Sequence, residues 1–510
     1  MRLEKCLQEM QSSVHEVPIL IGGKEYWTDE VRYQRMPFEH ERKLAKFSYA
    51  NQELIEKACE TALEAGKEWD LTPAEQRAEL FERAADLVSG KYRPLLNAAT
   101  MLGQAKVVKQ AEIDSAAELA DFFRFNSYYM RMLPKWLQPK STDVEKNHLE
   151  LRALDGFVAA ISPFNFTAIG GNLVGAPALM GNSLVWKPSD TAIYSGYLIM
   201  KLLQEAGLPV GVINFVPSEG LDFGRLITAN SRLAGVHFTG SLMTFQWLWS
   251  EIGLNIKRYE SFPRLIGECG GKNYHLIHVS ANIEVAAAQT IRSAFEYSGQ
   301  KCSACSRLYV PASKWAEMRR ILVEKVSSLK VGPPTDFSSY TSAVIDEAAF
   351  RRIESYLNFA RTIGHEVKVV HGGQTNSEIG YYIEPTILET TNPRNRLMLE
   401  EIFGPVMTVF VYQDHKLDET MDLINENPFS LTGAIFAQDE QFLARAKRRL
   451  RMSAGNMYIN DKSTGAVVGQ QPFGGSKHSG TNDKAGGPYN LMRWTNQQTV
   501  KRNLSPSSEI

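Results

Sequence analysis

A cysteine that follows a glycine–glutamine pair has the surroundings in this chain that best suit covalent chemistry. Cys302 lies in the run SGQKCSAC at residues 298–305, where its neighbours are small or polar, as in a loop. The nucleophilic form of cysteine is the thiolate, and we expect the neighbouring Lys301 to stabilise it. The segment therefore predicts a cysteine that bonds transiently to a substrate carbon.

Two other interpretations of this cysteine stay open. A free cysteine is often a small buried hydrophobic residue without reactivity. The spacing of Cys302 and Cys305 also matches a thiol–disulfide motif, which predicts redox chemistry of the pair. Two cysteines alone cannot complete a zinc site, so we predict no metal.

Two further polar residues could complete a catalytic set with Cys302. Glu268 lies in the glycine-rich run GECGGK at 267–272, and glycines allow the movement that a general base needs when it activates water. Asn165, in the run SPFNF at 162–166, carries an amide that can donate to an oxyanion. Together the three side chains predict a nucleophile, a base and an oxyanion donor.

Composition narrows the classes of protein that could carry this set. The chain has 510 residues, of which 44% are hydrophobic and 22% charged, as in a globular protein of two or three domains. Its formal charge of −1 gives no general attraction to nucleic acid or to an anionic membrane. Five cysteines do not suggest a disulfide framework, and no apolar run reaches the ~18 residues that span a bilayer. We predict a soluble protein that acts on small molecules, with no nucleic-acid or membrane partner.

The three side chains must be positioned by strands and helices. In the first half of the chain, short apolar runs alternate with helix-length segments. We expect strands at 157–161, 183–186, 212–216 and 235–238, and a helix at 191–206. This alternation predicts a doubly wound parallel sheet with its ligand beyond the carboxyl ends of the strands. The chain has no G-x-G-x-x-G motif, but the run FTGS at 238–241 follows a strand and opens a helix, where backbone N–H groups suit a pyrophosphate.

Other segments predict a second α/β domain and a projecting element. Between about 274 and 460 we expect strands at 307–310, 407–412 and 456–459, and a helix at 348–362. The run TPAE at 72–75 resembles a capping box that begins an amphipathic helix ending before Gly90. The polar stretch 133–152 and the tail after 490 fit neither core, and we predict a projecting β element that pairs with a second subunit.

Taken together, these segments resemble the aldehyde dehydrogenase superfamily over residues 27 to 499. Four motifs carry most of the likeness: ISPFNFTAIGGN at 161–172, GECGGKN at 267–273, SGQKCSAC at 298–305 and QQPFGG at 470–475. The resemblance implies an α/β fold of two doubly wound domains. It implies an NAD-binding domain at 1–132 and 153–273, a catalytic domain at 274–462, and a bridging or oligomerisation element at 133–152 and 488–510. It also implies a homodimer or a higher homo-oligomer.

The resemblance assigns a role to each member of the catalytic set. Cys302 would attack the carbon of a small aldehyde, Asn165 and the Cys302 N–H would hold the oxyanion, and Glu268 would deprotonate the hydrolytic water. NAD is the implied cofactor. The expected cofactor contacts are Ser162, Lys187, Gly240, Ser241, Leu242, Met243, Thr244, Glu401 and Phe403.

The motifs are most similar to the members that oxidise L-glutamate γ-semialdehyde to glutamate in proline catabolism. In those relatives the substrate is anchored by residues that match Glu118, Ser303, Gly465, Ala466 and Phe473. The relatives carry serine where this chain has Ala466, so one hydrogen bond to the substrate α-carboxylate is missing and we predict a raised KM. The resemblance places the protein in the mitochondrial matrix, with the cytoplasm as the alternative because no transit peptide is visible.

Two other functions are compatible with the same motifs. One is an NAD-dependent dehydrogenase of another short or acidic aldehyde, if Ala466 reflects a reshaped pocket. The other is a paralogue that binds NAD without turnover.

Overall fold

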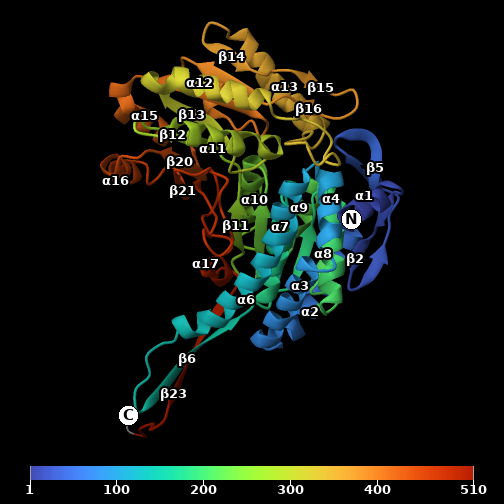
Figure 1. Cartoon of the computed structure of the whole chain (residues 1–510). Coiled ribbons are helices and arrows are strands. Elements are labelled where there is room, and N and C mark those ends of the chain that lie inside the picture. Colours follow the sequence, from blue (N-terminus) through green and yellow to red (C-terminus); the bar gives the residue numbers. More distant parts are fainter. Residues whose placement is uncertain (1, 509–510) are drawn as a thin grey trace.

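The computed structural model describes residues 2–508, which form two stacked α/β units and a narrow ribbon that extends from one end (Figure 1). The predicted α/β architecture, with two sheet-based domains, is confirmed. No helix within residues 2–508 is both long and apolar enough to cross a membrane.

The first unit is built on a seven-stranded sheet. Its strands, in spatial order, are β11 (Arg264–Glu268), β10 (Leu233–Thr239), β7 (Phe157–Ile161), β8 (Leu184–Lys187), β9 (Ile213–Phe215), β2 (Ile19–Ile21) and β3 (Lys24–Tyr26). The five strands from β11 to β9 are parallel. The four predicted strands are confirmed to within two residues at each end. Because these strands run in one direction, the chain segments that follow β7, β8, β10 and β11 emerge at the same edge.

Helices cover both faces of this sheet. The packing of one of them, α7 (Thr167–Leu179), against α6 (Glu118–Trp136) sets the direction of α6, which carries a residue of the site. The helices are α1 (Arg2–Gln11), α2 (Gln52–Leu71), α3 (Ala74–Ser89), α4 (Arg93–Gln104), α5 (Val108–Ala111), α6 (Glu118–Trp136), α7 (Thr167–Leu179), α8 (Ile193–Glu205), α9 (Gly220–Ala229) and α10 (Leu242–Leu254). Gly171 and Gly175 on α7 let α6 pack closely, because a Cβ at either position would come within 2.4 Å of Leu119 or 2.8 Å of Phe123. This close packing sets α6 so that its first residue, Glu118, reaches the site.

The helix predicted before Gly90 is confirmed as α3, but its capping box is wrong. Thr72 instead ends α2, where its hydroxyl donates to the carbonyl of Glu68 (3.2 Å), and Pro73 stands at the N-cap of α3 without a side-chain bond. The hydroxyl that the box needs is therefore already engaged by the preceding helix. A three-stranded sheet of β1 (His15–Val17), β5 (Glu39–Ser48) and β4 (Val31–Met36) flanks this unit.

The second unit is built on another seven-stranded sheet. Its strands, in spatial order, are β14 (Val367–His371), β17 (Thr386–Thr390), β18 (Val406–Tyr412), β13 (Cys305–Pro311), β12 (Asn273–Ile277), β20 (Thr432–Phe436) and β21 (Asn456–Ile459). The three strands predicted here are confirmed, as is the predicted helix, which is α13 (Glu347–Thr362). The other helices are α11 (Ile283–Phe295), α12 (Ala312–Ser327), α14 (Arg396–Leu399), α15 (Leu417–Glu426) and α16 (Glu440–Arg449).

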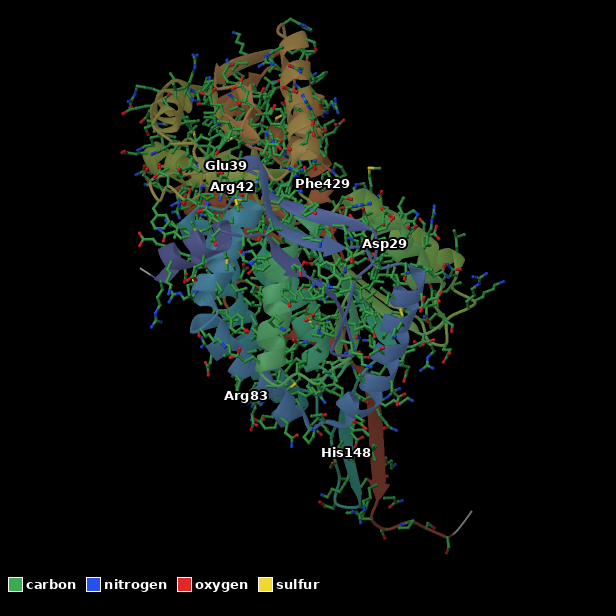
Figure 2. All side chains as sticks on the ribbon, turned by 90° about the vertical axis from the view of Figure 1, so that its right-hand side faces the viewer. Asp29, Glu39, Arg42, Arg83, His148 and Phe429 are labelled. Atoms are coloured by element: carbon green, nitrogen blue, oxygen red, sulfur yellow. The ribbon has the colours of Figure 1, made fainter. Side chains whose placement is uncertain are left out.

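The projecting element is a two-stranded antiparallel ribbon of β6 (Glu145–Arg152) and β23 (Asn496–Asn503). It extends away from both sheets in Figure 1 and again in Figure 2, where His148 marks it. Residues 133–136 complete α6, and Pro488–Met492 forms α17, so the β part of the element is narrower than predicted.

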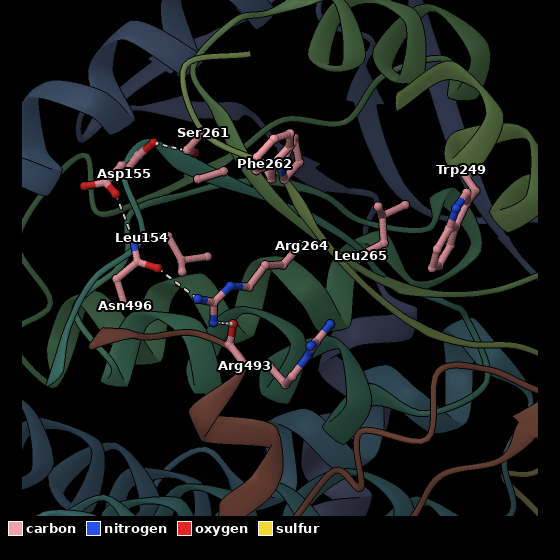
Figure 3. A pocket seen from close by; sticks show the side chains of 11 residues that line it. Leu154, Asp155, Trp249, Ser261, Phe262, Arg264, Leu265, Arg493 and Asn496 are labelled. Carbon is pink, nitrogen blue, oxygen red and sulfur yellow. Dashed lines mark hydrogen bonds between the residues drawn. The ribbon is translucent and has the colours of Figure 1, made fainter. Parts of the chain in front are cut away.

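Arg264 fastens the base of this ribbon to the first sheet (Figure 3). Its guanidinium donates to the carbonyls of Arg493 (2.7 Å) and Met492 (3.3 Å) and to the side-chain oxygen of Asn496 (2.8 Å). Asn496 in turn donates to the Asp155 carboxylate (2.8 Å). The ribbon therefore leaves the body at a fixed angle although no core lies beneath it.

Candidate active site

The predicted site lies where the two units meet. In the first sheet, pairings of Ile161 with Lys187 and of Thr239 with Glu268 bring the carboxyl ends of β7, β8, β10 and β11 to one edge. In the second unit, the loop that carries Cys302 precedes β13, and the loop that carries Glu401 precedes β18. The carboxyl edge of one sheet thus faces loops at the amino ends of the strands of the other.

The turn before Cys302 is held in an unusual backbone conformation. Tyr297, Ser298 and Gly299 have φ values of 53°, 50° and 67°, a left-handed run that costs energy for the two side-chain-bearing residues. At Gly299 a Cβ would lie 2.2 Å from the carbonyl oxygen of Gly404, so only glycine fits. The Thr341 hydroxyl fixes the turn: it accepts from the Ser298 N–H (2.7 Å) and shares a hydrogen bond with the Ser298 hydroxyl (2.9 Å). Strain of this kind is typical of functional sites.

Polar side chains of the second sheet clamp the loop from the other side. The Asn273 amide donates to the Cys302 carbonyl (2.7 Å). The Ser303 carbonyl accepts from the hydroxyls of Thr432 (3.1 Å) and Ser463 (2.9 Å). The position of the Cys302 sulfur is therefore set by both the preceding turn and the sheet behind it.

A cavity of about 240 Å³ brings most of the predicted catalytic and substrate residues together. Six of them line it: Glu118, Glu268, Cys302, Ser303, Ala466 and Phe473. Gly465 precedes Ala466 in the same loop without lining the cavity itself. A larger cavity of about 590 Å³ at the base of the ribbon (Figure 3) contains none of the predicted residues.

Asn165 lies beside the nucleophile loop but outside the cavity wall. Its side chain is buried and donates to the carbonyl of Gln300 (3.1 Å), two residues before Cys302. An amide has two N–H groups, and this bond uses one of them. The second N–H is the group that could serve an oxyanion.

Cys302 is protonated at neutral pH in this structure. Burial, followed by the nearby Glu268 and Glu401 carboxyls, raises the pKa of its thiol to about 12. The prediction that Lys301 stabilises the thiolate is wrong. The Lys301 ammonium instead hydrogen-bonds to Gln110 and pairs with the Asp114 and Glu296 carboxylates.

A buried network of charges, which sequence reasoning missed, closes one end of the cavity. Lys301 pairs with Asp114 (3.5 Å) and Glu296 (3.8 Å), and Lys462 also pairs with Glu296 (3.4 Å). Lys106, which is fully buried, pairs with Asp114. These partners come from segments that lie between residues 106 and 462, so no local pattern could have joined them. One signal was available: Asp114 and Glu118 lie four residues apart in a helical segment, a spacing that puts both on the same face.

Glu118 belongs to this end of the cavity. It follows a π-helical turn, Glu112–Ala117, of the kind often found at functional sites. Burial and then the Asp114 carboxylate raise the pKa of Glu118 to about 8, although Lys106 and Lys301 oppose this. Its Oε2 atom is buried and has no hydrogen-bond partner among residues 2–508. An unpaired buried carboxyl oxygen is costly, which points to a missing ligand.

Glu268 ends β11 and faces the opposite wall. The Gly475 N–H donates to its carboxyl group, while its Oε2 atom is buried without a partner in the described part of the chain. Burial raises the pKa of Glu268 well above its ordinary value. A carboxyl group with a raised pKa can accept a proton near neutral pH, as a general base must.

Two of the predicted cofactor residues meet at the ends of β7 and β8. The Ser162 N–H donates to the carbonyl of Lys187 (3.2 Å), and its hydroxyl accepts from the Trp186 indole (2.9 Å). Burial lowers the pKa of Lys187, while Asp190 and Glu219 oppose this. The Lys187 ammonium donates only a long bond, 3.4 Å, to the next carbonyl. It therefore has donors to spare.

The predicted pyrophosphate segment forms the amino end of α10. The Gly240 N–H donates to the Glu268 carbonyl (3.1 Å), and the Ser241 hydroxyl caps the helix by accepting from the Thr244 N–H (3.2 Å). The N–H groups of Leu242 and Met243 are left as the uncapped donors of the first turn, and Met243 is exposed.

Glu401 and Phe403 approach the nucleophile from the second unit. Glu401 accepts from the Gly271 N–H (2.8 Å), and a Cβ at Gly270 would lie 2.0 Å from its carboxyl oxygen. Burial raises the pKa of Glu401 to about 7. Phe403 has a φ of 54° and packs edge-on against Phe164.

Cys305 forms no disulfide with Cys302 in this structure. Both cysteines are free, and the buried Cys305 sulfhydryl donates within β13 to the Arg307 carbonyl (3.5 Å). This arrangement disfavours the thiol–disulfide interpretation. Among residues 2–508, no group of three or more His, Cys, Asp or Glu side chains is placed to hold a metal ion.

Comparisons with known proteins extend the likeness to the whole chain. The model of the aldehyde dehydrogenase family matches residues 27–500. This chain is 52% identical to mitochondrial delta-1-pyrroline-5-carboxylate dehydrogenase of Mus musculus over 506 residues, which cover 99% of this chain and 90% of that protein. The Homo sapiens protein of the same name is 51% identical with the same coverage. The crystal structure of delta-pyrroline-5-carboxylate dehydrogenase from Mycobacterium tuberculosis bound with NAD has a TM-score of 0.95 and 44% identity, and the match covers 100% of this chain and 94% of that one.

Proposed function

We propose, because this chain belongs to the aldehyde dehydrogenase family, that it oxidises L-glutamate γ-semialdehyde to L-glutamate with NAD as electron acceptor. The semialdehyde is the open form of 1-pyrroline-5-carboxylate, and the reaction is a step of proline catabolism. The observation that carries the proposal is the cavity in which Cys302, Glu268 and Glu118 meet. It joins a nucleophile, a base and an unpaired acid suited to an amino group.

The reaction has two stages, and different residues of the site act in each. The Cys302 thiol gives up its proton to solvent as its sulfur bonds to the aldehyde carbon, and the free amide N–H of Asn165 with the Cys302 N–H holds the oxyanion of the thiohemiacetal. NAD, when bound, accepts the hydride that leaves this carbon. Glu268 then takes a proton from water, whose oxygen attacks the thioester, and glutamate leaves while the thiol is regenerated.

The residues around the first sheet fit the cofactor. Spare donors of Lys187, with Ser162, suit the adenosine half. The segment Gly240 to Thr244, through its uncapped N–H groups, suits the pyrophosphate. Glu401 and Phe403, beside the nucleophile loop, suit the nicotinamide ribose. On this basis residues 1–132 and 153–273 form the NAD-binding domain, and residues 274–462 form the catalytic domain.

The substrate fits the cavity by charge. The Glu118 carboxyl, which lacks a partner for Oε2, suits the α-ammonium group. The backbone N–H groups of Gly465 and Ala466, with Ser303, suit the α-carboxylate, and Phe473 packs against the methylene groups between the two ends.

The test is the appearance of NADH with three aldehydes. Glutamate semialdehyde is expected to give a kcat/KM at least about 10-fold above that of succinate semialdehyde, which lacks the amino group that Glu118 binds, since a hydrogen bond to a charged group contributes roughly 1.5–3 kcal/mol. Propanal, which lacks both charged groups, is expected to be poorer still. A preference for either of these would favour the alternative of another short or acidic aldehyde. NAD binding without any NADH would favour the inactive paralogue.

The missing hydroxyl at Ala466 gives a sharper prediction. Ala466→Ser is expected to lower the KM for glutamate semialdehyde about 10-fold or more, because the new hydroxyl can donate to the α-carboxylate. Steady-state kinetics with both enzymes would measure it. The KM for propanal, which has no carboxylate, serves as the control and should not change. An unaltered KM for the semialdehyde would show that position 466 does not contact the carboxylate.

The ribbon supports a homo-oligomer, and the proposed assembly is a homodimer or a larger homo-oligomer. We place it in the mitochondrial matrix, since the names of the mouse and human relatives include the word mitochondrial. An isolated two-stranded ribbon is at best marginally stable in water. In this ribbon Leu151 packs against the main core, whereas the half-buried Leu149, farther out on the same face, is not among the residues of that core or packed against it. Residues 133–152 and 488–510 would thus serve as the oligomerisation element. The cytoplasm remains the alternative compartment.

This assembly predicts that Leu149→Asp weakens self-association at least about 10-fold, since a charge would have to be buried in the contact. Sedimentation equilibrium of the wild type and the variant would measure it. Val210→Asp, at an exposed valine on the body, is the matched control and should leave the mass unchanged. A wild-type chain that sediments as a monomer at micromolar concentration would contradict the assembly.

A further inference from the structure

Lys484 is a cation at the active site to which the reaction above gives no role. Its backbone lies in the left-handed region, with a φ of 54°. Its ammonium donates to the carbonyls of Gly455 (2.7 Å) and Gly474 (3.0 Å) and to the side-chain oxygen of Asn456 (3.1 Å). Three acceptors use all three of its N–H groups. The side chain is therefore held in one place.

These three bonds reach the segment that touches Glu268. Gly474 and Gly475 pass directly against its carboxyl group, because a Cβ at Gly474 would lie 2.8 Å from Oε1 and the Gly475 N–H donates to the carboxyl. Beside them, Phe473 and Ala485 exchange two backbone hydrogen bonds (2.9 and 2.8 Å). Lys484 thus ties this segment to the beginning of β21.

We propose that Lys484 is a positioning residue for thioester hydrolysis, which holds the Gly474–Gly475 segment against Glu268 and places a positive charge beside that carboxylate. The inference rests on the proposed function, since it gives Lys484 a part in the second stage of that reaction. It predicts that Lys484 affects hydrolysis and leaves hydride transfer nearly unchanged.

Other groups that face Glu268 make the effect of this charge measurable. Lys484 lowers the pKa of Glu268, whereas Asp483 raises it, and Asp483 itself is paired with Arg493 (3.0 Å). The thiols of Cys302 and Cys269 also lie within electrostatic reach of Glu268, but both are protonated near neutral pH because burial raises each pKa to about 12. Removing the Lys484 charge should therefore raise the pKa of Glu268.

Three substitutions separate the charge from the hydrogen bonds. Lys484→Gln keeps a donor and removes the charge, Lys484→Met removes both, and Lys484→Arg keeps the charge. Lys477→Met is the matched control, because the Lys477 ammonium also donates to two backbone carbonyls, of Asn425 (3.2 Å) and Asn427 (3.3 Å), but away from Glu268.

Rapid-mixing measurements of NADH resolve the two stages. We expect all four variants to form about one NADH per active site in a first turnover at close to the wild-type rate. Steady-state turnover should fall about 10-fold or more in the Gln and Met variants and recover largely in the Arg variant. The acid limb of the kcat–pH profile should move to higher pH in the Gln variant, because loss of the neighbouring cation destabilises the carboxylate. Lys477→Met should match the wild type.

An ester that needs no NAD keeps this test separate from the proposed function. p-Nitrophenyl acetate acylates a reactive cysteine directly, and hydrolysis of the acetyl-enzyme then depends on Glu268. If glutamate semialdehyde gave no NADH, the proposed function would fail, while slower ester turnover after an unchanged burst in Lys484→Gln would still support the inference. Equal losses of burst and turnover, or an acid limb that stays in place in Lys484→Gln, would overturn it.

Discussion

Cys302→Ser is expected to lower kcat/KM for the semialdehyde by at least about 10⁴-fold, as loss of a covalent nucleophile does in other enzymes. A hydroxyl loses its proton far less readily than a thiol. The environment of Cys302 already disfavours an anion, since burial and two carboxyls raise the pKa of the thiol to about 12. Serine at this position would stay protonated, and the thiohemiacetal could not form.

Two further measurements make this result specific to the sulfur. NAD binding, followed by calorimetry, should be unchanged in Cys302→Ser, which shows that the fold survives. Cys305→Ser should retain most of the activity, because the Cys305 sulfhydryl only donates within β13. If Cys305→Ser abolished activity instead, the thiol–disulfide interpretation would be correct. Full activity of Cys302→Ser would remove the basis of the proposed function.

The sequence predicted the sheets well because their signals are local. Strands such as Phe157–Ile161 and Asn456–Ile459 are short apolar runs between turn residues, and buried parallel strands have that pattern wherever they lie in the chain. Cys302 and Glu268 were singled out in the same way, from the glycines and small residues next to them in the chain, and the structure brings both side chains to one cavity. The capping box failed because Thr72 had a competing partner in the preceding helix.

What the sequence did not predict depends on partners brought together by the fold. Lys301 adjoins Cys302 in the chain, which suggested that it acts on the sulfur, but its ammonium is directed toward Asp114 and Glu296. Residues 301–303 form a bend and a turn, in which adjacent side chains point in different directions, so sequence neighbours need not share an environment. Lys484 was missed for the same reason: its three acceptors lie 10 to 29 residues earlier in the chain.

Glu268→Gln is expected to leave the first turnover nearly intact and to stop the enzyme after it. Glutamine has the same shape and can still accept from the Gly475 N–H, but it cannot take a proton from water. We expect a burst of about one NADH per site, followed by a steady-state rate about 10²–10⁴-fold below that of the wild type. Mass spectrometry of the quenched protein should find the acyl group on Cys302.

The dependence of kcat on pH in the wild type should report the ionisation of Glu268. Glu268 works as a base only when it is ionised, so kcat rises with pH through its pKa. Burial penalises the carboxylate and raises that pKa well above the ordinary value, so the acid limb should lie above the range of a solvated glutamate. In Glu268→Gln this limb should vanish. A limb that persisted in the variant would belong to another group.

One rival role for Glu268 is that it deprotonates Cys302 instead of water, and the charges at the site distinguish the two. The Glu268 carboxylate raises the pKa of the Cys302 thiol, so a neutral glutamine should lower that pKa. At alkaline pH, alkylation of Cys302 by iodoacetamide should therefore be faster in Glu268→Gln than in the wild type, because the thiolate is the reactive form. If Glu268 were the base for the thiol, the variant should alkylate more slowly and should also lose its NADH burst. Faster alkylation with an intact burst would place the proton transfer at the water, after hydride has left the substrate.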